Sequence, residues 1–345
     1  MAQIPILLLE PKGGQPSSRD QAEAATLAAL LGPENKNIAL EHEFFSPNEA
    51  DSIEKAVDRW AGRVLGVVGA TGVAESKRLG ELAQDRRLLC FVANNNPVVW
   101  EHRRHIFHIG VPTDLIASAI AEGMVGSIGA KRIFIIRDIV EFQTKLARSV
   151  ERWLRRNGHE VQTQSGHEED APNSVKQFEP DAVFFACSDT ALVLPWICEL
   201  RRALPKVYLL IGMSQLRSTF PLQVADERVL FVDLFCRSRP KRQAEKTFMA
   251  TLTTAGKAIP TPNHGFGWDT MSLCSGALIA AKGDVTAAIR NLESGARYEG
   301  ATGYFEFGRE NHNGRETFNP VVISQIKKGR VFSYGKDKPY NFPRI

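Results

Sequence analysis

Apolar side chains recur along this chain in two alternating patterns: short continuous runs, and longer stretches with three- and four-residue spacing. The runs predict buried strands, and the stretches predict amphipathic helices. The predicted strands are Ile4–Leu9, Ile38–Phe45, Val64–Val68, Leu88–Ala93, Ile106–Gly110, Arg132–Ile136, Glu160–Gln164, Ala182–Ala186, Val207–Ile211 and Val229–Leu234. The helices between them are Gln21–Leu31, Glu49–Trp60, Ala74–Asp85, Asp114–Ile128, Val140–Arg156, Thr190–Leu204 and Pro240–Ala255.

Strand and helix alternation predicts parallel sheets with helices on both faces. Ten strands exceed the about five or six of a typical sheet, so we expect two sheets in two lobes. The last part of the chain differs, because two helices, Asp269–Lys282 and Val285–Asn291, precede a polar stretch rich in glycine and the apolar run Pro320–Ile326. This pattern predicts a β-hairpin and a final strand at a sheet edge. The expected fold class is α/β, with two doubly wound parallel-sheet lobes.

Composition narrows the choice of partners. The chain has 345 residues, 43% of them apolar, and its 43 Lys and Arg against 39 Asp and Glu leave a net charge of +4. Acids are interspersed among the basic residues, so the sequence gives no reason to expect a nucleic-acid partner. Met1 is followed directly by the first predicted strand, without a basic and apolar leader. Both a cytoplasmic protein and an exported protein with a trimmed leader fit this start.

Motifs for catalysis, metals and nucleotides are missing from the sequence. It contains neither GxGxxG nor GxxxxGK[ST], and no Gly-x-Ser-x-Gly elbow, so we expect no cofactor and no catalytic site. An enzyme that uses Asp138 or Asp189 as a base is the remaining catalytic hypothesis. The cysteines have no metal-binding spacing, and we interpret them as small buried apolar side chains: Cys90, Cys187, Cys198, Cys236 and Cys274.

The loops after the predicted strands are small, polar and rich in glycine. In open parallel sheets, ligands bind beyond the carboxyl ends of the strands, where helix N-termini present free amides. These loops therefore predict a polar binding pocket. Two alternatives stay open: Asp138 and Asp189 are helix caps, or the asparagine loop is an ordinary turn. The loops are Gly69-Ala70-Thr71-Gly72, Asn94-Asn95-Asn96-Pro97, Arg137-Asp138, Cys187-Ser188-Asp189 and Gly212-Met213-Ser214-Gln215.

The order of these motifs resembles the branched-chain amino acid and amide receptors, which are type I periplasmic binding proteins of ABC importers (the Leu/Ile/Val-binding type). The resemblance covers roughly Ile4 to Lys336, and the order and spacing of its motifs are more specific than any one of them. Besides the loops above, the matching motifs are Ile106-Phe107-His108-Ile109-Gly110-Val111-Pro112, Gly129-Ala130-Lys131, Pro180-Asp181-Ala182-Val183, Trp268-Asp269, Ala301-Thr302-Gly303 and Gln325–Arg330.

This resemblance implies two lobes joined by three crossover segments, near Ser118, Cys236 and Pro320. Lobe 1 is expected to contain residues 1–117 and 236–320, and lobe 2 residues 118–235 and 321–345. A ligand would be bound by hinge closure in the cleft between the lobes.

The family pattern also implies which residues contact the ligand. Lobe 1 would contribute Ala70, Thr71, Gly72, Asn94, Asn95 and Asn96, and lobe 2 would contribute Asp138, Phe142, Ser188, Asp189, Met213 and Ser214. In amino acid receptors of this group a hydroxyl holds the ligand carboxylate and an acid holds its ammonium, roles that would fall to Thr71 and Asp189.

Three departures from the family pattern widen the range of ligands. Asparagines stand where the family has serine, alanine and threonine, Phe142 replaces a tyrosine, and Met213 stands near an expected acid. Asparagine both donates and accepts hydrogen bonds, so urea, an amide or an aromatic acid remains open beside an amino acid.

The resulting expectation is a solute-binding receptor that passes a small polar ligand to the membrane subunits of an ABC transporter in the periplasm. The alternative is a cytoplasmic ligand sensor of the same fold that regulates a partner protein.

Overall fold

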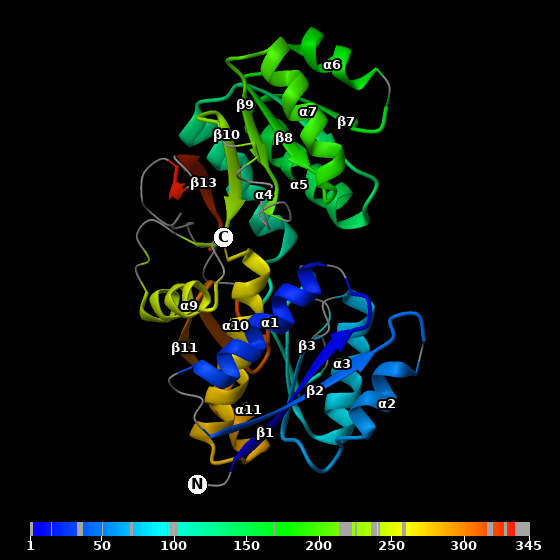
Figure 1. Cartoon of the computed structure of the whole chain (residues 1–345), viewed down its shortest axis with the longest axis vertical. Coiled ribbons are helices and arrows are strands. Elements are labelled where there is room, and N and C mark those ends of the chain that lie inside the picture. The colour runs from blue at the N-terminus through cyan, green and yellow to red at the C-terminus, as the bar shows by residue number, and fades with distance from the viewer. Residues whose placement is uncertain are drawn as a thin grey trace. The chain divides into compact units, whose positions relative to one another are not determined.

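The computed structural model describes residues 3–14, 16–32, 37–49, 51–69, 72–94, 96, 99, 103–168, 170–213, 223–224, 226–235, 240, 242–256, 260–315, 320–327 and 330–334. The described part of the chain divides into two compact units (Figure 1). Unit 1 is formed from Met1–Pro112 and Lys241–Phe318, and unit 2 from Thr113–Pro240 and Asn319–Phe342.

Unit 1 is built on a parallel sheet with the strand order β2-β1-β3-β4-β5. Its strands are β1 (Ile4–Pro11), β2 (Ile38–Phe45), β3 (Gly66–Gly69), β4 (Leu89–Val92) and β5 (Ile106–His108). The order reverses between β1 and β3, and such a switch point is where open α/β sheets bind ligands. Gly69 has a φ of 121°, and a Cβ on it would lie 2.2 Å from the Leu9 carbonyl oxygen. Only glycine therefore fits where β3 ends against β1.

Helices cover both faces of this sheet. In Figure 1, α1 (Pro16–Leu31) and α10 (Pro262–Ala280) pack against each other on one face, and α2 (Ser52–Asp58) and α3 (Val73–Arg86) lie on the other. Also in unit 1 are α9 (Gln243–Thr254), α11 (Val285–Leu292) and the hairpin of β11 (Ser294–Gly300) and β12 (Gly303–Gly308). Among the described residues, no single helix is long and apolar enough to cross a bilayer; α10 and α11 pass that test only together, as a pair bent by 114°.

Unit 2 has a sheet with the strand order β14-β13-β10-β9-β8-β6-β7. Its strands are β6 (Arg132–Arg137), β7 (Glu160–Ser165), β8 (Ala182–Ala186), β9 (Tyr208–Ile211), β10 (Val229–Asp233), β13 (Val322–Lys327) and β14 (Arg330–Ser333). The first five are parallel, whereas β13 and β14 join antiparallel. The order reverses between β6 and β8, so the switch point of this sheet lies between their carboxyl ends.

The helices of unit 2 also form two layers. On one face, α6 (Ala171–Phe178) and α7 (Thr190–Ala203) bury an apolar core that includes Phe134, Phe185 and Trp196. The other face carries α4 (Thr113–Glu122) and α5 (Glu141–Arg156), which pack against each other. The chain continues from α4 as a π-helix, Gly123–Ile128.

All ten predicted strands are confirmed, with ends shifted by one or two residues. The helix predicted from Asp269 begins seven residues earlier, at Pro262, because Thr261 and His264 form a capping box there. The predicted helix Asp114–Ile128 is α-helical only as far as Glu122. Two elements, α6 and β14, were not predicted.

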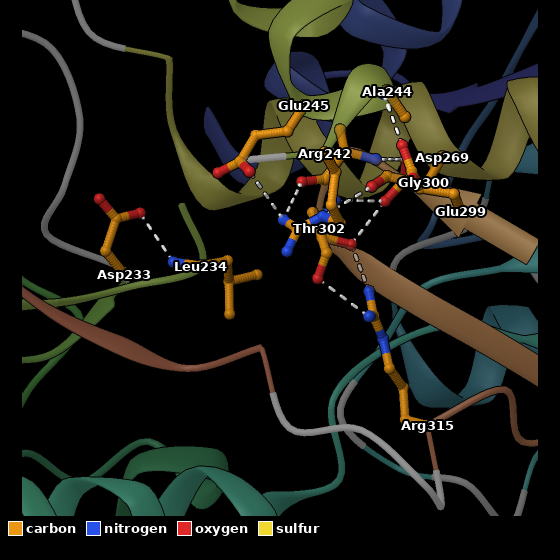
Figure 2. Close-up of polar contacts among 11 residues, drawn as sticks. Asp233, Leu234, Arg242, Ala244, Glu245, Asp269, Glu299, Gly300, Thr302 and Arg315 are labelled. Atoms are coloured by element: carbon orange, nitrogen blue, oxygen red, sulfur yellow. Dashed lines mark hydrogen bonds and ion pairs between the residues drawn. The ribbon is translucent and has the colours of Figure 1, made fainter. Parts of the chain in front are cut away.

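A buried polar network in unit 1 connects α10 to the β11–β12 turn (Figure 2). Asp269, only 1% exposed, accepts hydrogen bonds from the amides of Ala301 (2.6 Å) and Thr302 (2.8 Å) and from the Thr302 hydroxyl (2.5 Å). Burial raises the pKa of Asp269, while these bonds and the charge of Arg315 oppose that rise. The turn is therefore fixed to α10 through its main chain.

Two arginines bind the carbonyl groups of the same turn. Arg315, fully buried, donates to the Thr302 carbonyl at 2.9 Å, to the Thr302 hydroxyl and to the Ile109 carbonyl at 3.0 Å. Arg242 donates to the Ala301 carbonyl at 2.9 Å and forms an ion pair with Glu245, which Figure 2 shows beside it. Burial lowers the pKa of Arg315 to about 9, so its side chain stays charged at neutral pH.

Removing the carboxylate from this network is expected to destabilise unit 1 strongly. Asp269→Ala should lower the free energy of unfolding by about 3–5 kcal/mol, because it leaves two buried amides and the Arg315 charge uncompensated. The control is Asp58→Ala, which removes an exposed ion pair with Arg86 and should cost less than about 1 kcal/mol. Urea unfolding of both variants measures this difference, and equal small losses would contradict the network's role.

His108 lies in β5, the edge strand of the unit 1 sheet. The segment of residues 312–314 pairs with β5 at this place. The main-chain amide of His108 donates to the His312 carbonyl (2.9 Å), and its carbonyl accepts from the Gly314 amide (2.9 Å). The ring is completely buried. Burial lowers its pKa from 6.5 to about 4, with a smaller contribution from the charge of Arg315.

This depressed pKa predicts acid destabilisation. Between pH 6.5 and 4 the unfolded chain binds a proton at His108 that the folded chain does not, so stability falls as pH falls through this window. From pH 7 to pH 5 the contribution of His108 should decrease by about 2 kcal/mol. Urea unfolding at several pH values should show a shallower pH dependence for His108→Gln than for the wild type; parallel curves would contradict the assignment.

Candidate functional site

In unit 1, α3 is the next element of the chain after β3. Gly72 is the N-cap of α3 and has an extended backbone. The Glu75 carboxylate folds back over Gly72, with Oε2 only 1.9 Å from the position that a Cβ would take. A negative charge of the protein itself thus lies at this helix N-terminus, where the macrodipole favours an anion.

Asn94 follows the neighbouring strand β4, and only one end of its side-chain amide is hydrogen-bonded within the described part of the chain. It is 7% exposed, and its Oδ1 accepts a hydrogen bond from the Asn96 amide at 2.9 Å. An N–H donor can only meet the oxygen, so this bond fixes which way the side-chain amide faces. The other end, Nδ2, is buried and has no partner among the described residues. An unpaired buried donor costs stability until an acceptor meets it.

In unit 2, Asp138 ties together the two loops at the switch point. It is 3% exposed, and its carboxylate accepts from the Val140 amide (3.0 Å) and the Ser188 amide (2.6 Å). The Ser188 hydroxyl in turn accepts from Gln143 Nε2 at 2.9 Å. Both Asp138 oxygens thus hold main-chain amides, whereas the N-cap of α5 is Val140, without a side-chain cap bond.

The other predicted residues of unit 2 lie around the same edge. Asp189 is exposed, and as the N-cap of α7 it accepts from the Ala191 amide at 2.8 Å. Phe142, in the first turn of α5, and Met213, after β9, are half-buried. Four predicted residues lie outside the described part of the chain: Ala70, Thr71, Asn95 and Ser214.

Large exposed apolar side chains gather at these carboxyl-end edges. Of the six found among the described residues, four follow or end such strands. In unit 1 they are Phe44 (43% exposed) and Val73 (45%), and in unit 2 Ile139 (77%) and Val140 (45%). These side chains are available for contact with an apolar part of a ligand.

Sequence reasoning missed Gln143 and His108, because neither stands in a loop at a strand end. For His108 the available signal was a polar side chain within an apolar strand, whereas Gln143 lies in a largely polar helix and gave none. The prediction that all cysteines are buried was wrong for Cys198, which is exposed on α7, whereas Cys90, Cys187 and Cys274 are buried. No group of three or more His, Cys, Asp or Glu side chains in the described ranges could hold a metal ion.

Solved structures resemble this chain over nearly its whole length. An ABC transporter substrate-binding protein from Sphaerobacter thermophilus is 14% identical, covers 99% of both chains and has a TM-score of 0.80. A leucine-binding protein from Thermotoga maritima is 19% identical, with 96% of this chain and 97% of that chain covered and a TM-score of 0.73. A solute-binding protein from R. palustris, in complex with benzoate, is 15% identical, with 97% and 96% covered and a TM-score of 0.73.

At these identities the solved structures establish the fold, and they confirm the expected arrangement of α/β units. No curated protein matches the sequence. A sequence profile described as periplasmic binding protein matches residues 47–330, which is most of the chain. The chain therefore belongs to the periplasmic binding protein family, with the type I fold of ABC transporter substrate-binding proteins.

Proposed function

We propose that this protein is the receptor of an ABC importer for a small ligand that combines an apolar body with a carboxylate or amide group. Membership of the family supports the receptor role and a location in the periplasm. In this proposal the ligand is bound by hinge closure of the two units and is then delivered to the membrane subunits of the transporter.

The unpartnered Nδ2 of Asn94 is the observation that carries the proposal. It is a buried donor at the carboxyl end of β4, and it requires an acceptor that the described part of the protein does not supply. A ligand carboxylate or amide oxygen would satisfy it, and a charged acceptor makes the stronger hydrogen bond.

The exposed apolar side chains at the same edges favour a ligand with an apolar body. Burial of the apolar side chains of Val73, Ile139 and Val140 against such a body would stabilise the complex. An ammonium group has less support, because both oxygens of Asp138 already bind main-chain amides. Asp189 is the acid that an amino acid ligand would use. Benzoate, benzamide and L-leucine represent the three ligand classes to be separated: a carboxylate, an amide and an amino acid.

Asn94→Asp should weaken benzoate binding far more than benzamide binding. The substitution keeps the acceptor for the Asn96 amide but replaces Nδ2 by a negatively charged oxygen. For benzoate, loss of a charge-assisted bond and added repulsion should raise Kd by about a hundredfold; benzamide can donate to the new oxygen and should lose less than about tenfold. Isothermal titration calorimetry at neutral pH measures both.

The matched control is Asn157→Asp, on the exposed C-cap of α5, which should bind as the wild type does. Equal losses for both ligands would reject the contact at Asn94. A wild-type protein that none of the three compounds binds or stabilises would reject the ligand class.

A further inference from the structure

The main chain of Asn94 is held by a side chain from the next strand. His108 Nε2 lies 2.8 Å from the Asn94 carbonyl oxygen, inside the protein. Because a carbonyl oxygen only accepts, Nε2 carries the hydrogen and donates it. The ring thus adds a hydrogen bond beyond the last main-chain bond of the ladder, from the Ile109 amide to the Val92 carbonyl.

Close packing by Gly110, two residues after β5, supports the same peptide group. A Cβ on Gly110 would lie 1.5 Å from the Asn94 oxygen and 2.6 Å from its carbonyl carbon. Only glycine leaves room for the Asn94 main chain at this place. The Asn94 peptide is therefore located by two residues of one segment, His108 and Gly110.

The His108 ring is itself fixed from its other side. Nδ1 lies 3.3 Å from Asn313 Oδ1, and because the hydrogen of the neutral ring is on Nε2, this is a packing contact and not a hydrogen bond. Asn313 Oδ1 accepts from the Arg315 amide at 3.3 Å. Main-chain bonds to His312 and Gly314 hold His108 in line with this segment. Full burial, the hydrogen bond to Asn94 and the main-chain bonds to His312 and Gly314 therefore hold the ring as a support for Asn94.

We propose that His108 is a positioning residue for the ligand: by donating to the Asn94 carbonyl, it holds the unpaired Nδ2 of Asn94 where a ligand acceptor meets it. This inference rests on the proposed function. The direction of Nδ2 follows from the position of the Asn94 main chain and from the bond between Oδ1 and the Asn96 amide. A shift of the main chain misplaces the donor, and hydrogen bonds weaken steeply with misalignment.

The test is a double-mutant cycle with benzoate as the probe and Kd as the readout. His108→Leu removes the donor and should raise Kd by about tenfold or more, and His108→Gln, whose amide nitrogen can take the place of Nε2, should restore most of that loss. In the Asn94→Ala background, His108→Leu should cost less than about twofold, because its effect passes through Asn94. Equal costs in both backgrounds, or a His108→Gln variant that binds as His108→Leu does, would overturn the proposal.

His312→Leu is the matched control for loss of a buried histidine. His312 lies at the same edge, where Nδ1 contacts the Ile106 carbonyl (2.9 Å) and the ring stacks on Phe107, and no contact joins its ring to Asn94 among the described residues. This variant is expected to melt at a lower temperature yet bind benzoate like the wild type. A loss of affinity equal to that of His108→Leu would assign the effect to general destabilisation.

Hydrogen exchange without ligand separates failure of this inference from failure of the proposed function. In the peptide covering residues 89–96, His108→Leu should speed amide exchange by about tenfold or more, and His108→Gln and His312→Leu should not. If benzoate does not bind the wild type but exchange follows this pattern, the ligand class is wrong and the support of Asn94 by His108 stands. Unchanged exchange in His108→Leu would overturn the support itself.

Discussion

The buried Asp269 carboxylate is the constraint on which the organisation of unit 1 depends. A charge without solvent is costly, and here three donors from the β11–β12 turn and the nearby Arg315 compensate it. Thr302 is central, because its hydroxyl donates to Asp269 and accepts from Arg315. Segments distant in the sequence are therefore fixed by polar bonds that tolerate little displacement.

This network also anchors the segments by which the chain leaves or enters unit 1. Ile109, whose carbonyl accepts from Arg315, lies three residues before Pro112, where the first passage occurs. Arg242 follows the second boundary at Lys241, and Arg315 lies three residues before the third at Phe318. All three passages thus have, on their unit 1 side, a residue that is bound to this network, as the proposed hinge closure would require.

At the carboxyl ends of the strands, polar groups fall into two kinds. Asp138 and the Oδ1 of Asn94 serve the fold, because main-chain amides occupy them. Nδ2 of Asn94 and the exposed Ile139 and Val140 have no such role among the described contacts. A functional site is expected among groups that the fold leaves unused, since leaving them unused costs stability.

The sequence by itself determined the strands, most helices and the fold class, because apolar periodicity reflects burial on one or two faces of an element. It also indicated that the loops at the strand ends are polar. Two residues of these loops, Asn94 and Asp138, are buried and hydrogen-bonded to main-chain amides. It missed α6, whose eight residues give a short and weak pattern, and it placed the start of α10 too late.

Only the tertiary structure decided which polar atoms are occupied. Asp138 and Asn94 look alike in the sequence, as polar residues after buried strands. Asp138 binds two amides, whereas Asn94 keeps a donor that no described residue meets. The partners that other strands supply, Ser188 for the Asp138 carboxylate and His108 for the Asn94 main-chain carbonyl, are 50 and 14 residues away along the chain. Hydrogen bonds depend on distances and angles between such segments, and a periodic pattern contains neither.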